Sequence, residues 1–124
     1  MIGTLGAVVL DCPDPTSLAA FYAELVGGTV KAEDEDETWV DLDREGGQML
    51  SFQFAPDHRP PAWPDPERPQ QFHLDIAVPR AEMAAAEEVV LGLGATLLED
   101  DLGGKRNWRV YADPAGHPFC LCAC

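Results

Sequence analysis

The stretch AVVLDCPDPTSLAAFYAELV, residues 7–26, has a counterpart further along the chain, HLDIAVPRAEMAAAEEVVLG, residues 73–92. Both stretches pass from an apolar segment through a proline, at the same aligned place, into a segment with apolar residues at helical spacing. Beyond these stretches, a slightly larger offset aligns Trp39 with Trp108. The order of these matches predicts one structural module that is present twice in the chain.

Each copy is predicted to fold as a strand, a helix and three further strands. In the first copy, a strand over residues 5–12 ends at Pro13, and the pair Asp14–Pro15 begins a helix, because Asp can cap a helix and Pro suits its first position. Gly27 ends that helix. The other expected elements are strands at 29–33, 37–42 and 48–54, then a strand at 71–78, a helix at 80–93, and strands at 95–99, 107–112 and 117–122.

A proline-rich connection separates the two copies. Residues 56–69 hold six of the chain's eleven prolines, and proline has no backbone N–H donor and a fixed φ angle. We therefore expect a stiff, extended segment between a first module at residues 1–55 and a second module at 70–124. The length of 124 residues fits a single domain.

The composition excludes some classes of partner. A formal net charge of −14 disfavours binding to nucleic acid or anionic membranes, because such binding depends on clustered Lys and Arg. The chain has no run of about 18 apolar residues and no secretory signal pattern, so we expect a cytoplasmic protein. The acidic residues 33–37 are expected to form a solvated turn between two strands.

The four cysteines are expected to be reduced, because no secretory signal accompanies them. Cys120, Cys122 and Cys124 alternate, so on a strand their thiols would point to one face. Three such thiols could bind a soft metal. The interpretation that we favour is that they act as small buried apolar side chains.

Several motifs together resemble a known family. They are DPAGHP at residues 113–118 before the last strand, and LDCPD at residues 10–14 before a helix that contains Phe21 and Tyr22. They resemble the glyoxalase and bleomycin-resistance family, the vicinal oxygen chelate superfamily, and residues 63–75 resemble its actinobacterial glyoxalase-like branch. The resemblance implies an α+β fold in which two βαβββ modules form a concave mixed sheet with the helices on the convex side.

On that fold, the period-two alternation of strands predicts which side chains enter the cavity. Phe119 and Leu121 would face the helix, so Cys120 and Cys122 would face the cavity. The same alternation predicts that Ser51, Gln53, His73 and Asp75 also face the cavity.

The resemblance also implies where a metal would bind. Metal-dependent relatives carry His, Gln or Glu on the first, fourth, fifth and eighth strands, and here these positions are Ala7, Ser51, His73 and Cys120. His73 alone matches, so we expect no metal cofactor. If a divalent metal does bind, a shift of two residues on the fourth strand would give the ligands Gln53, His73 and Cys120.

Aromatic and basic residues indicate what the cavity would hold. Trp63 and Trp108 have broad apolar faces that suit a flat organic ligand, and Arg109 could pair with a ligand carboxylate. Alternatively, Trp108 serves in packing, Trp63 lies at a dimer interface, and Arg109 pairs with surface acids.

Two classes of function remain. The first is a homodimeric protein that binds a small apolar or aromatic molecule without a metal. The second is a lyase or isomerase in which His73, with Asp75 or Cys120, transfers a proton, or in which the Cys120 thiolate attacks the substrate. Metal-dependent glyoxalase chemistry ranks third, because three of the four ligand positions do not fit.

Overall fold

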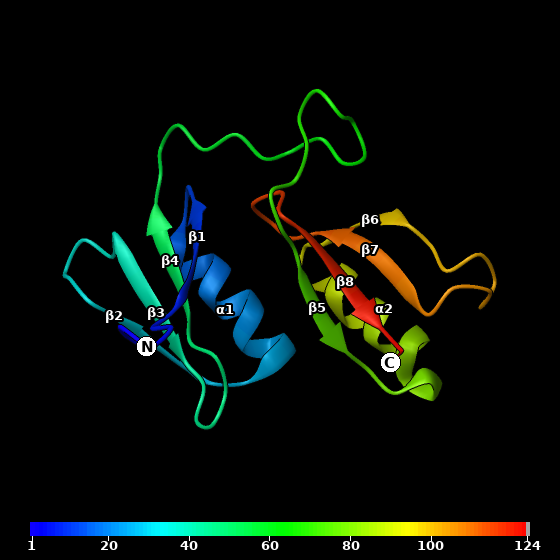
Figure 1. Ribbon diagram of the computed structural model, residues 1–124, viewed down its shortest axis with the longest axis horizontal. Helices are drawn as coiled ribbons and strands as arrows, with labels where there is room; N and C mark the ends of the chain where they lie inside the picture. The colour runs from blue at the N-terminus through cyan, green and yellow to red at the C-terminus, as the bar shows by residue number, and fades with distance from the viewer. Residues whose placement is uncertain (124) are drawn as a thin grey trace. The chain divides into compact units, whose positions relative to one another are not determined.

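The computed structural model describes residues 1–123, which divide into two compact units (Figure 1). The first unit comprises Met1–His58, and the second begins at Arg59. Each unit contains a four-stranded sheet and an α-helix in the order βαβββ. The α+β class and the duplicated module are therefore confirmed.

The first unit consists of β1 (Val8–Cys12), α1 (Pro15–Val26), β2 (Thr29–Ala32), β3 (Trp39–Asp43) and β4 (Leu50–Phe54). The strands lie in the order β1-β4-β3-β2, with β1 parallel to β4 and the other neighbours antiparallel. Asp14 caps α1 as expected, because its carboxylate accepts a hydrogen bond from the backbone N–H of Ser17 at 3.2 Å. In the turn between β2 and β3, the Asp34 carboxylate accepts a hydrogen bond from the backbone N–H of Thr38 at 2.8 Å.

The second unit consists of β5 (Leu74–Ala77), the short 3₁₀ helix η1 (Arg80–Glu82), α2 (Met83–Gly92), β6 (Thr96–Glu99), β7 (Trp108–Ala112) and β8 (Pro118–Cys122). Its strand order, β5-β8-β7-β6, repeats that of the first unit, as Figure 1 shows. No helix within residues 1–123 has the length and apolar content needed to cross a membrane.

The strand registers of the two units agree with the alignment found in the sequence. The equivalent partners are Val8–Leu50 and Leu74–Phe119 on the parallel pairs, and Trp39–Gln53 and Trp108–Cys122 on the antiparallel pairs. The first strands of the two modules are related by the offset that aligns residues 7–26 with 73–92. The third and fourth strands are related by the larger offset that aligns Trp39 with Trp108. The two sheets are therefore equivalent residue by residue at these strands.

Each unit has its own aromatic core. The rings of Tyr22 and Phe52 stack with their centroids 5.8 Å apart, and those of Tyr111 and Phe119 stack at 5.5 Å. All four side chains are fully buried. Burying a large apolar side chain stabilises a fold by about 1.5–3 kcal/mol. These pairs are therefore main contributors to the stability of each unit.

The first strand and the helix of the second module differ in detail from the expectation. The strand expected at 71–78 is limited to β5, and Phe72, which lies within the expected range, precedes β5 and is 64% exposed. In α2, Met83 and Val90 are buried. Leu93 is exposed, because α2 ends at Gly92 and the helical spacing no longer applies beyond that residue.

Candidate functional site

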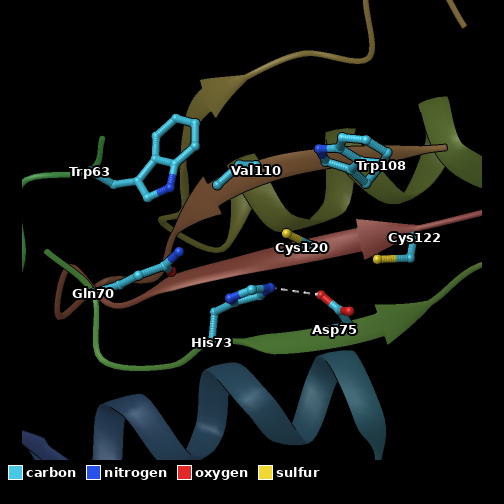
Figure 2. Close-up of a pocket in the computed structure, with 8 residues that line it drawn as sticks. All are labelled: Trp63, Gln70, His73, Asp75, Trp108, Val110, Cys120 and Cys122. Atoms are coloured by element: carbon cyan, nitrogen blue, oxygen red, sulfur yellow. Dashed lines mark ion pairs between the residues drawn. The ribbon is translucent and has the colours of Figure 1, made fainter. Parts of the chain in front are cut away.

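A pocket of about 380 Å³ lies in the second unit (Figure 2). Two adjacent strands supply its floor, with Trp108 and Val110 on β7 and Cys120 and Cys122 on β8. The other lining residues are Trp63 and Gln70 from the connection before β5, His73 just before β5, and Asp75 on β5. The pocket therefore combines a sheet surface with an irregular segment.

The floor of the pocket is apolar and lies on the sheet face opposite α2. Val110, Cys120 and Cys122 form a buried cluster, and Trp63 packs against it. On the other face, the Tyr111 hydroxyl donates a hydrogen bond to Glu87 of α2 at 2.6 Å. The alternation predicted for β8 is thus observed for Cys120 and Cys122, while Cys124 lies outside the described residues.

The DPAGHP turn before β8 holds the connection in place. The Asp113 carboxylate accepts hydrogen bonds from the backbone N–H groups of Ala115 at 2.9 Å and His117 at 3.0 Å. Gly116 has a φ of 93°, and a Cβ atom there would collide with the ring of Pro60. This close approach fixes the start of the connection against the turn. It thereby positions Trp63, which follows shortly after Pro60 in the connection.

His73, Asp75 and Cys120 form the polar group of the pocket. His73 Nε2 lies 3.2 Å from Asp75 Oδ1, and Figure 2 shows this pair beside Cys120. Burial raises the pKa of the Cys120 thiol to about 11, and the charge of Asp75 and a hydrogen bond to it act in the same direction. Cys120 is therefore a neutral thiol near neutral pH, which disfavours the thiolate attack considered from the sequence.

These three residues also form a group that could hold a cation. Their ligand atoms lie within 4.8 Å of one another, and a nitrogen, an oxygen and a sulfur donor together fit a borderline-soft ion such as zinc. A bound divalent ion would supply a Lewis acid. Asp75 takes part here in place of Gln53, which lies on β4 of the first unit.

Arg109, expected to contact a ligand, does not line this pocket. It lies on the α2 side of β7, where its guanidinium pairs with Glu87 and Asp101, each at 2.9 Å. This placement agrees with the alternative that it pairs with acidic side chains. Neighbouring residues on a strand face opposite sides, so Trp108 and Arg109 cannot both enter one pocket.

Ser51 and Gln53 belong to the first unit. Ser51 is fully buried, and its hydroxyl donates a hydrogen bond to Asp41 Oδ1 at 2.6 Å. The indole N–H of Trp39 donates to the same oxygen at 2.9 Å. Ser51 therefore has a partner within its own sheet, while the Gln53 side chain is exposed.

Two pocket residues were missed by the sequence reasoning. Val110 follows Trp108 on β7 at the next position that faces the same side, so strand alternation was a sufficient signal for it. Gln70 lies in the irregular segment just before β5, where no periodicity applies. Its side-chain oxygen Oε1 is buried and has no hydrogen-bond partner among the described residues.

Comparison with known families and structures places the fold in a defined group. A family model described as "Glyoxalase-like domain" matches residues 7–122 of the chain. No curated protein matches the chain.

Solved structures resemble the whole chain. One is a glyoxalase/bleomycin resistance protein/dioxygenase family enzyme from Burkholderia phytofirmans, with 18% identity, a TM-score of 0.71, and coverage of 96% of this chain and 97% of that one. Another is the fosfomycin resistance protein FosX from Mesorhizobium loti, with 14% identity, a TM-score of 0.73, and coverage of 100% and 94%. A variant of FosX from Listeria monocytogenes, complexed with Mn(II) and a dihydroxypropylphosphonic acid, has 16% identity, a TM-score of 0.71, and coverage of 100% and 94%. At these identities the likeness concerns the fold alone.

Proposed function

The chain belongs to the glyoxalase-like domain family, and we propose that it binds a small, flat, largely apolar organic molecule in the pocket of its second unit. This scaffold supports unrelated activities, so the function has to be argued from the site itself. The observation that carries the proposal is the pairing of Trp63 and Trp108 with the apolar floor of the same pocket.

The shape and lining of the pocket favour an aromatic ligand. Its volume of about 380 Å³ lies in the range of small-molecule sites. Trp108 is 43% exposed, although burial of so large an apolar surface is favourable. A flat molecule between the two indoles would cover Trp108 and contact Val110 and Cys122. Tryptophan supplies such contacts with little loss of conformational entropy, because it has two rotatable side-chain bonds.

Tryptophan fluorescence tests the binding function, with naphthalene derivatives of different charge as probes. We expect at least one of them to quench the emission saturably, with one molecule bound per chain. Trp108→Leu should abolish saturable binding. Trp39→Leu, the equivalent change on β3 of the first unit, should keep it. Binding that survives Trp108→Leu, or no binding by any probe, contradicts the proposal.

A second candidate function is proton transfer by His73. The observation that favours it is the 3.2 Å separation between His73 Nε2 and Asp75 Oδ1. A carboxylate in this position orients the imidazole and favours the tautomer with its proton on Nε2, so Nδ1 is left as the proton acceptor. The pair would serve a lyase or isomerase that removes a proton next to a carbonyl.

A substrate panel separates the two candidates. The proton-transfer candidate predicts turnover of a carbonyl compound that is lost in His73→Ala and retained in His58→Gln, which changes a histidine of the first unit. Circular dichroism spectra of both variants control for folding. Turnover that His73→Ala leaves unchanged would rule out this role for His73.

A further inference from the structure

We propose that the ligand is a flat organic cation with N–H donors, and that Asp75 and Gln70 select it. This inference rests on the proposed function, because it describes the charge and the hydrogen-bonding groups of the molecule that the pocket binds. Three independent features of the pocket support it: its charge, an unpaired acceptor, and its aromatic surfaces.

The charge of the pocket is negative. Asp75 is the carboxylate among its lining residues, and its side chain is 62% exposed, so a ligand can reach it. No Lys or Arg is among the described residues that line the pocket. The chain as a whole has a net charge of −14, which attracts cations towards any cleft and repels anions.

Two arginines on or next to β7, Arg106 and Arg109, already have acidic partners. Arg109 is held by Glu87 and Asp101 on the opposite face of β7. Arg106 lies over the ring of Trp108, 5.7 Å from its centroid, and forms an ion pair with Glu99. An anionic ligand would therefore have to break an existing ion pair to gain either of these arginines as a partner. The Arg106 guanidinium thus already makes a cation–π contact with this indole.

Gln70 supplies the second feature. Its Oε1 atom is buried and lacks a hydrogen-bond partner among residues 1–123, and Figure 2 shows the side chain between those of Trp63 and His73. An unpaired buried acceptor is unfavourable, so a rotation of the side chain that turns Oε1 into the pocket would be stabilised by a hydrogen bond from a ligand N–H. Gln70 and Asp75 are both acceptors, which matches a ligand with at least two N–H donors, such as an amidinium or a protonated aromatic amine.

The aromatic surfaces favour the same class. A cation over the face of a tryptophan is attracted by the ring quadrupole, and a flat cation can use this attraction and still bury apolar area. The phosphonic acid in the Listeria FosX complex is an anion at neutral pH. The pocket of this chain favours the opposite charge.

Three isosteric probes test the charge directly: naphthalene carboxamidine, which is a cation, the neutral naphthalene carboxamide, and the naphthoate anion. We expect the amidine to bind about tenfold more tightly than the amide, and the naphthoate more weakly than both, by tryptophan fluorescence and calorimetry. The affinity for the amidine should fall as salt is added. If the amide or naphthoate binds as tightly as the amidine, the charge inference is overturned while the proposed function stands. If none of the three binds, both are overturned.

Matched variants test the two selecting residues. Asp75→Asn should reduce the preference for the amidine over the amide, whereas Glu88→Gln, which removes a negative charge from the exposed side of α2, should preserve it. Gln70→Leu should weaken binding of the amidine, whereas Gln71→Leu, a change at an exposed neighbour, should not. If Glu88→Gln changes the preference as much as Asp75→Asn does, the role of Asp75 is contradicted. If Gln71→Leu weakens binding as much as Gln70→Leu does, the role of Gln70 is contradicted. Thermal unfolding of each variant controls for stability.

Discussion

The two modules share a strand order and a register, yet they use equivalent positions in different ways. In the first unit, Asp41 on β3 accepts hydrogen bonds from Trp39 and from Ser51, so the polar groups of this face satisfy one another. In the second unit, the position equivalent to Asp41 is Val110, and the position equivalent to Ser51 is Cys120. The acceptor there is Asp75 on β5, at the edge of a pocket.

This difference shows how a duplicated scaffold can acquire one site. Replacing the central carboxylate by Val110 leaves an apolar floor on which a ligand can rest. The carboxylate of the second module is that of Asp75, which lies on β5 beside His73. A ligand in the pocket could contact it there. In the first module these polar groups pair with one another, and in the second module Asp75 is exposed at the pocket.

The turns before the last strands should give the largest difference between the modules. Gly116→Ala should lower the free energy of unfolding by about 3 kcal/mol, because the backbone has a positive φ and the new methyl group collides with Pro60. Gly47→Ala, at the equivalent position, meets the flexible side chain of Arg44 and should cost under about 1 kcal/mol. Urea unfolding measures both. Equal losses would contradict the anchoring of the connection by the turn.

The reactivity of Cys120 tests the polar group of the pocket. With a pKa of about 11, its thiolate fraction near neutral pH should be roughly a hundredfold below that of an ordinary thiol. Labelling by iodoacetamide, followed peptide by peptide with mass spectrometry, should be correspondingly slow and should accelerate in Asp75→Asn. Labelling as fast as that of glutathione would show that the thiol is not held in its neutral form.

The carboxylate of the first module can be removed to imitate the second. Asp41→Val should lower the free energy of unfolding by about 2 kcal/mol, because the buried hydroxyl of Ser51 and the indole N–H of Trp39 lose their shared acceptor. The double variant Asp41→Val with Ser51→Ala should recover part of this loss. A single variant as stable as the parent protein would mean that Asp41 does not hold this face together.

The helix caps should give the smallest difference. Asp14 caps α1, whereas η1 and α2 have no side-chain hydrogen bond at their N-caps. Asp14→Ala should therefore cost about 1 kcal/mol. The hydrogen bond to the Ser17 side chain, with one to its backbone, lowers the pKa of Asp14. The contribution is thus fully present above the unfolded pKa of about 3.9 and is lost as the pH falls through the lower folded value. Stability curves of the two proteins should converge at low pH, and a constant gap would contradict this assignment.

Much of the fold could be predicted because the signals were local or repeated. Pro13, Asp14 and Gly27 mark the ends of the first strand and helix, and the two offsets between the copies reappear as strand registers. The ends of the strand and helix in the second copy were harder to predict. The apolar residues Phe72 and Leu93 continue the apolar spacing of β5 and α2 beyond the ends of these elements.

The site could be predicted in part. Alternation was enough to place Cys120 and Cys122 on one face, and it argues against a shared pocket for Trp108 and Arg109. Gln70 had no such signal, because its position depends on the path of an irregular connection that is held by a long-range approach of Pro60 to Gly116. Such tertiary contacts are not encoded in any short sequence pattern.

The most direct test of a ligand site in the second module is a two-dimensional NMR titration of the labelled protein with naphthalene carboxamidine. The account predicts that the largest amide shifts fall on residues 63–75 and on β7 and β8. Largest shifts on β3 and β4, the equivalent strands of the first module, would contradict it.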